Sequence, residues 1–234
     1  MKTIYKISLT TYIFYLLLIL SGYINYLVIY LFIVIFHEFG HIIMIKILGY
    51  KINRIVLYPT GAIIDTNINL NIKSNHLFLI SIAGIINQII LMILIPSSGN
   101  YNYLIFKQLN YSLMIFNLLP LYPLDGYKIF LSMIERIFKY RISIKLSYII
   151  SYLFIFIFFY YTKNIYIFLI LLILNINYFN IYNYYYNKFL LERYLYKYQY
   201  KSFVSVNRIN DIYKNKYNYI DGVREEDYFD KFFF

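Results

Sequence analysis

The sequence predicts an all-α polytopic membrane protein with about six transmembrane helices and a small cytoplasmic β-hairpin insertion. Three observations lead to this fold class: the composition, the lengths of the apolar segments and the placement of the basic residues. Of the 234 residues, 61% are hydrophobic and only 14% are charged, whereas about 25% of residues are charged in an ordinary soluble domain. Because the chain contains no cysteine, disulfides and cysteine-ligated metal are both excluded.

The apolar segments have the length of membrane spans. Each approaches the roughly 20 residues needed to cross a hydrocarbon core about 30 Å thick. They cover residues 8–22, 25–48, 76–95, 101–121, 142–162 and 164–182. The first could instead be a signal peptide, since Lys2 and Lys6 precede a short apolar core, but no small-x-small cleavage site follows it.

The basic residues indicate the orientation in the lipid bilayer. With the N-terminus inside, the inside stretches, counted with the adjoining ends of the segments, hold two Lys or Arg before the first segment, four around the connection between the second and third (Lys46 to Lys73), five around that between the fourth and fifth (Lys128 to Lys145) and nine after residue 187. The outside loops hold only Lys163, and Lys107 lies within the fourth segment. The positive-inside rule therefore predicts that both termini are cytoplasmic. Since topology alone explains the net charge of +11, we expect no nucleic-acid partner.

A β-hairpin is predicted on the cytoplasmic side, over residues 52–67. The sequence "INRIVLYPTGAIIDTN" reads as two short strands around a Pro-Thr-Gly turn that ends at Gly61. It could be an ordinary surface hairpin. Alternatively, its exposed edge could hold a substrate unwound as an added strand, which a protease of helical substrates needs.

The segment "HEFGH" places three polar side chains inside an apolar run. His37 and His41 are four residues apart, so on a helix they lie one above the other and can bind one zinc ion. Glu38 is about 100° further round the helix, where it can act as a general base toward a zinc-activated water. The alternative is a pair of hydrogen-bonded core histidines with Glu38 paired to a cation, but no Lys or Arg lies nearby in the apolar part of the segment.

A catalytic zinc site needs a third protein ligand, and Asp125 is the best candidate. Besides Glu38, it is the only acidic residue within or at the end of an apolar segment. It belongs to "NLLPLYPLDG", in which Pro120 and Pro123 interrupt the helix and Gly126 allows a tight turn after the carboxylate. Irregular backbone at membrane depth is tolerated where protein or a water-filled cavity covers it. By itself, Asp125 could equally be a turn or capping residue at the membrane surface.

These motifs together resemble the site-2 protease family of intramembrane zinc metalloproteases, and within it most closely the enzymes of sporulation. The matching stretches are "HEFGH", "YPTGAIID", "AGIIN", "NLLPLYPLDG" and "FLLERY", in the family's order, between about residues 30 and 195. The resemblance implies that His37, His41 and Asp125 bind one Zn2+ and that Glu38 activates water. Further residues are expected to line or brace the substrate cleft: Asn117, Asn87, Gly61, Pro120 and Pro123.

Three departures from the family pattern are visible. Tyr127 stands where the sporulation enzymes have a second glycine, and Ile85 stands where the wider family often has proline. The third concerns the CBS domain that the sporulation enzymes carry. We expect residues 1–187 to form the transmembrane metalloprotease domain and residues 188–234 to form a short, solvated cytoplasmic tail, with the CBS domain absent or vestigial.

The resemblance also implies a biological role. The substrate would be a membrane-associated precursor, pro-sigma-K, cleaved in the mother-cell membrane around the forespore, and regulatory membrane proteins would act as partners. Two other functions are compatible with the same residues: a catalytically silent membrane scaffold and a metal transporter. The intact Glu38 argues against the scaffold, and the lack of internal repeats argues against the transporter.

Overall fold

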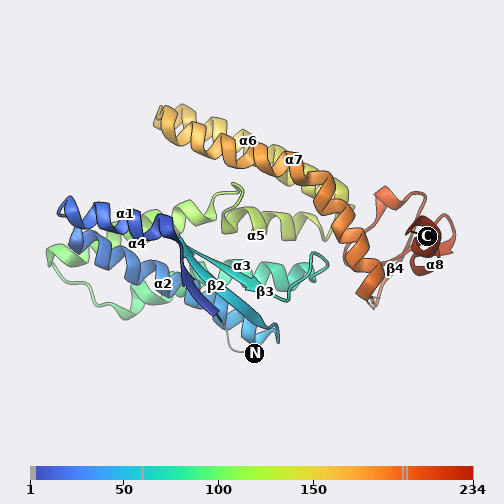
Figure 1. Cartoon of the computed structure of the whole chain (residues 1–234), viewed down its shortest axis with the longest axis horizontal. Coiled ribbons are helices and arrows are strands. Elements are labelled where there is room, and N and C mark those ends of the chain that lie inside the picture. Colours follow the sequence, from blue (N-terminus) through green and yellow to red (C-terminus); the bar gives the residue numbers. More distant parts are fainter. Residues whose placement is uncertain (1–3, 59–60, 197, 199, 234) are drawn as a thin grey trace. The chain divides into compact units, whose positions relative to one another are not determined.

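The computed structural model describes residues 4–58, 61–196, 198 and 200–233. The chain is mostly helical and divides into two compact units, one of residues 1–68 and 79–118 and the other of residues 69–78 and 119–234. The elements follow one another along the chain as Figure 1 shows: β1 (Ile4–Ile7), α1 (Leu9–Leu20), α2 (Ile24–Ile47), β2 (Ile52–Tyr58), β3 (Gly61–Thr66), α3 (Ser74–Leu94), α4 (Tyr101–Leu118), α5 (Asp125–Ile134), α6 (Tyr140–Thr162), α7 (Ile165–Tyr196), β4 (Phe203–Val206), η1 (Ile209–Asp211), β5 (Tyr217–Ile220), β6 (Val223–Arg224) and α8 (Glu225–Phe233).

Each apolar segment of the sequence coincides with a helix: α1, α2, α3, α4, α6 and α7. Within the described part of the chain, three of these are long and apolar enough to span a membrane, namely α2, α3 and α6. Helix α1 is apolar but has only 12 residues. The protein is therefore a mostly helical membrane protein with three candidate spans.

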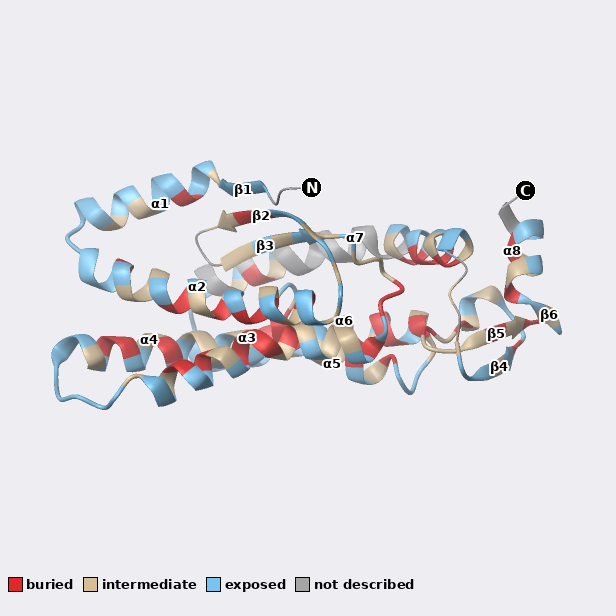
Figure 2. Ribbon diagram, turned by 90° about the horizontal axis from the view of Figure 1, so that it is seen from below, coloured by how far each residue is buried: buried red, intermediate tan, exposed pale blue. Residues whose placement is uncertain are grey.

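In the first unit, α2 is far more buried than α1. Helix α1 buries only Thr11, whereas α2 has buried residues along most of its length, from Leu27 to Ile45 (Figure 2). Ile33 of α2 packs with Leu91 of α3 and Phe106 of α4 in a common apolar cluster. This packing holds α2 against its neighbours one turn before His37.

The predicted hairpin is present, and it belongs to a larger sheet. Strands β2 and β3 pair antiparallel from Ile52–Thr66 to Tyr58–Gly61, and the two turn residues 59 and 60 lie outside the described residues. A third strand, β1, pairs parallel with β2, so the strand order is β1-β2-β3. The sequence did not predict β1, because a parallel pairing with a strand more than forty residues away leaves no local pattern.

In the second unit, the expectation of a solvated tail is wrong for the described residues. Residues 203–206, 217–220 and 223–224 form a three-stranded sheet of order β4-β5-β6, which α8 follows. Ile212, Ile220 and Phe229 are at most 1% exposed and pack in one cluster with Phe189 of α7. These apolar side chains are separated by charged ones in the sequence, so only the folded unit brings them together.

Candidate metal centre

Helix α2 brings His37 and His41 together by its own periodicity. Both rings are buried, at 4% and 7% exposure, and their Nε2 atoms lie 3.1 Å apart. The ring planes are nearly perpendicular, at 82°. The predicted arrangement of two imidazoles on one helical face is therefore present in the fold.

A backbone contact fixes the tautomer of His41. Its Nδ1 lies 2.7 Å from the carbonyl oxygen of Ile80 on α3. A carbonyl oxygen can only accept a hydrogen bond, so Nδ1 carries a proton, and Nε2 is the nitrogen directed toward His37. Metal-binding histidines commonly donate the other ring N–H to a carbonyl in this way.

A side chain supplies the corresponding contact to His37. Its Nδ1 lies 3.0 Å from Oε1 of Gln88, which is fully buried on α3. With both Nδ1 atoms facing oxygens, both Nε2 atoms face each other across a short gap. Two imidazole nitrogens of this kind are suitable ligands for one divalent zinc ion.

Two glycines allow α2 and α3 to approach each other closely. A Cβ atom on Gly84 of α3 would lie 2.5 Å from His41 Nε2 and 2.6 Å from His37 Cε1. A Cβ atom on Gly40 of α2 would collide with the backbone of Ala83. The "AGIIN" stretch therefore matters at the site through the missing side chain of Gly84, which sequence reasoning did not single out.

Glu38 lies next to the hairpin. Its Oε1 accepts a hydrogen bond of 2.8 Å from the backbone N–H of Ala62 at the start of β3. A Cβ atom on Gly61 would lie 2.8 Å from the same oxygen. The sequence predicted that Gly61 lines the cleft, and the structure supplies a reason that the sequence did not: the glycine leaves room for the carboxylate of Glu38.

The two predicted cleft asparagines make different contacts. Asn117, near the end of α4, has its Nδ2 3.5 Å from His37 Nε2, so it lies beside the histidine pair. Asn87 of α3 donates from Nδ2 to the carbonyl oxygen of Phe36 on α2. Its contact therefore braces one helix against the other.

Asp125 is buried, with 7% exposure, and is the first residue of α5. Contrary to the expected turn, Gly126 lies within the first turn of this helix, and the irregular segment with Pro120 and Pro123 precedes the carboxylate. Lys128 forms an ion pair of 3.1 Å with Asp125 Oδ1.

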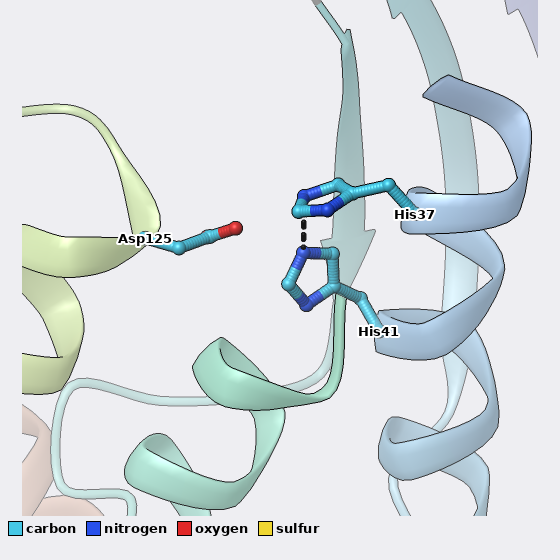
Figure 3. Close-up of side chains that lie close together, drawn as sticks. All are labelled: His37, His41 and Asp125. Atoms are coloured by element: carbon cyan, nitrogen blue, oxygen red, sulfur yellow. Dashed lines mark hydrogen bonds between the residues drawn. The ribbon is translucent and has the colours of Figure 1, made fainter. Parts of the chain in front are cut away.

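His37, His41 and Asp125 each offer one ligand atom, and these atoms all lie within 4.8 Å of one another (Figure 3). Two imidazoles and one carboxylate form a possible metal site.

Sequence reasoning missed the residues that hold the histidines. Gln88 and Asn110 are both fully buried, on α3 and α4. Their only signal in the sequence is an amide side chain inside an apolar segment, where an unpaired polar group is costly. That signal is shared by several other asparagines in the chain, so it could not single them out.

Comparisons with known proteins agree with this geometry. The model of "Peptidase family M50" matches residues 98–161. Stage IV sporulation protein FB of Bacillus subtilis (strain 168) is 29% identical over 117 residues, which are 47% of this chain and 41% of that protein. The chain thus spans less than half the length of this curated relative.

A solved structure gives the most extensive match. The site-2 protease from Methanocaldococcus jannaschii superimposes with a TM-score of 0.54 at 25% identity, covering 75% of this chain and 89% of that one. The family model and the solved structure are both of proteases, and the curated relative is a sporulation protein. The chain is therefore similar to peptidase family M50 and, in fold and sequence, to a site-2 protease.

Proposed function

We propose that the protein is an intramembrane zinc metalloprotease that cleaves a membrane-associated protein precursor. The observation that carries the proposal is the buried group of His37, His41 and Asp125, whose ligand atoms lie within 4.8 Å of one another. These three residues would hold the zinc ion. When bound, zinc would polarise the scissile carbonyl and increase the acidity of water.

The protein's own groups would carry the proton transfers. Glu38 follows His37 directly and is partly exposed, so it can take a proton from the attacking water and deliver it to the leaving amine. The Ala62 N–H holds one oxygen of this carboxylate, which leaves the other oxygen for water. Asn117, close to His37, is a candidate donor to the developing oxyanion.

The hairpin next to Glu38 suggests how a substrate segment would be held. The sheet has two outer edges, on β1 and on β3, and the edge of β3 is the candidate for an added strand because its Ala62 N–H binds Glu38. That strand begins at Gly61, beside the proposed base. A substrate paired there would be extended, with its peptide bonds accessible. Pro120 and Pro123, which keep the segment before Asp125 irregular, would complete the cleft.

The membrane topology is part of the proposal. We infer six spans, α1 to α4 with α6 and α7, and both termini in the cytoplasm, on the strength of the basic residues in the inside loops. By analogy with the relative named for stage IV of sporulation, the substrate would be pro-sigma-K and the location the mother-cell membrane around the forespore. Regulatory membrane proteins would control access to the cleft.

The test compares the parental protein with Glu38→Gln. The full chain is co-expressed with pro-sigma-K, cleavage is followed by immunoblotting, and the zinc content of the purified protein is measured. We expect Glu38→Gln to abolish cleavage and keep zinc, because it removes the base and leaves the three ligands. Glu226→Gln, in α8, is the control and should behave like the parental protein.

Three results would contradict the proposal. Loss of zinc together with activity in Glu38→Gln would make Glu38 a ligand. Normal zinc binding without cleavage by the parental protein would favour a silent scaffold for this substrate. Zinc movement across proteoliposomes without any proteolysis would favour a transporter.

A further inference from the structure

We propose that Gln88 and Asn110 form a positioning pair that holds His37 in the tautomer and ring orientation that zinc binding requires. Neither residue is a ligand or touches the scissile bond. The inference rests on the zinc site proposed above and deepens it. It assigns the two buried amides a role in metal affinity.

The contacts form a short chain that ends in a closed loop. His37 Nδ1 is 3.0 Å from Gln88 Oε1, and Gln88 Nε2 donates to Asn110 Oδ1 at 3.2 Å. Asn110 Nδ2 then donates to the backbone carbonyl of Gln88, also at 3.2 Å. Helices α2, α3 and α4 each contribute one of the three side chains.

The loop determines which atom each amide presents. A backbone carbonyl only accepts, so Asn110 must turn its NH2 group toward Gln88 O and its oxygen toward the Gln88 side chain. Gln88 must therefore offer its own NH2 group to Asn110 and its Oε1 to His37. Oε1 in turn requires a proton on His37 Nδ1, so that Nε2, which faces His41, is the ring nitrogen that can bind a metal ion.

The two histidines are held by different means, and this makes the proposal testable. His41 is held by the carbonyl of Ile80, which no side-chain substitution removes. His37 depends on two side chains that are 0% exposed. Buried amides in apolar helices are costly unless they are hydrogen-bonded, and these contacts offset that cost. Removing the Gln88 amide should therefore free the His37 ring to rotate and to change tautomer.

The experiment measures zinc affinity of the purified full chain by competition with a chelator. Gln88→Met keeps the length of the side chain and removes the acceptor, and we expect it to weaken zinc binding about 10- to 100-fold, as loss of a hydrogen-bond partner to a ligand does elsewhere. Gln108→Met is the matched control, because Gln108 is exposed on α4, and its affinity should equal that of the parental protein. Thermal unfolding of both variants without metal shows whether the fold is retained.

Two further variants separate positioning from simple packing. Gln88→Glu keeps an oxygen acceptor at the same reach and should recover most of the affinity lost in Gln88→Met. Asn110→Leu removes only the group that orients Gln88, so its loss should be smaller than that of Gln88→Met. In Co2+-substituted protein, the visible absorption of Gln88→Met should differ from that of Gln108→Met.

The outcomes distinguish this inference from the proposed function. If the parental protein binds zinc and Gln88→Met binds it equally well, Gln88 does not position His37 and the inference is overturned. Equal losses in Gln88→Glu and Gln88→Met would make the effect one of packing and would overturn it as well. If the parental protein itself binds no zinc, the proposed site fails, and the inference fails with it.

Discussion

The two units of the protein bury polar groups of different kinds. In the first unit these groups include neutral amides and imidazoles, connected from Asn110 through Gln88 to His37. In the second unit they include two charged pairs. Lys214 Nζ lies 2.9 Å and 3.0 Å from the two oxygens of Glu135, and both residues are at most 2% exposed.

A second ion pair repeats the pattern in the second unit. Arg193 of α7 lies 3.1 Å from Glu225 at the start of α8, and both are buried. The ring of Tyr200 lies 4.5 Å from the Arg193 guanidinium, and desolvation raises the pKa of Tyr200 to about 12, which keeps its phenol neutral at physiological pH. The charges of this unit are thus paired with each other, and they connect helices to the terminal sheet.

This difference separates function from stability. The buried amides Gln88 and Asn110 of the first unit lead to His37, so changing them should alter metal binding and catalysis before it alters folding. In the second unit, the ion pairs of Lys214 with Glu135 and of Arg193 with Glu225 neutralise their own charges, and removing one partner leaves an uncompensated buried charge. Asp125, although it is also in the second unit, is a proposed metal ligand and is tested as such. The following substitutions test this separation, from the largest expected effect to the smallest.

Asp125→Asn should have the largest effect. A neutral amide is a poor zinc ligand, so we expect loss of detectable cleavage and of most of the bound zinc, measured by immunoblotting and metal analysis. Asp65→Asn, on the exposed side of β3, should change neither. If Asp125→Asn bound zinc normally, the third ligand would have to be another residue.

Lys214→Met should mainly affect stability. It leaves Glu135 buried without its cation, and we expect a loss of about 3–5 kcal/mol in the free energy of unfolding of the second unit. Urea unfolding followed by limited proteolysis measures it, with the exposed Lys201→Met as the control. Replacing both partners, as in Lys214→Met with Glu135→Leu, should restore most of the stability. The separation breaks down if Lys214→Met lowers zinc affinity at unchanged stability.

Gly61→Ala should reduce catalysis and spare the metal. The added Cβ atom would lie 2.8 Å from Glu38 Oε1, so the carboxylate must shift. Because a displacement of about 1 Å can cost roughly 100-fold in rate, we expect a 10- to 100-fold lower kcat/KM with zinc still bound. The matched control is Gly49→Ala. Gly49 also has a positive φ, of 81°, but a Cβ atom on Gly49 would meet nothing within 4 Å beyond its own chain neighbours. Equal losses in the two variants would attribute the effect to backbone strain.

Lys128→Met should have the smallest effect, and in the opposite direction. The side chain of Lys128 is 49% exposed in its ion pair with Asp125, and exposed pairs contribute at most about 1 kcal/mol. Removing this competing cation should raise zinc affinity by no more than about fivefold. Lys188→Met, in a similarly exposed pair on α7, should leave it unchanged. A large loss of affinity would instead give Lys128 a part in shaping the site.

The sequence alone determined the features that depend on local spacing. Helical periodicity places His37 and His41 on one face whatever surrounds them. The apolar segments predicted six helices, of which three in the described part of the chain are long and apolar enough to span a membrane, and the Pro-Thr-Gly turn predicted the β2–β3 hairpin. These predictions succeeded because each depends on residues only a few positions apart.

Tertiary structure decided the contacts between residues distant in sequence. Nothing in the order of residues indicates that Gln88 meets His37, that β1 joins the hairpin sheet or that Lys214 pairs with Glu135 across 79 positions. The basic and acidic tail appeared solvated because its charges were counted without their partners. A buried charge or amide is stable only when a partner offsets its desolvation, and that partner is chosen by the fold.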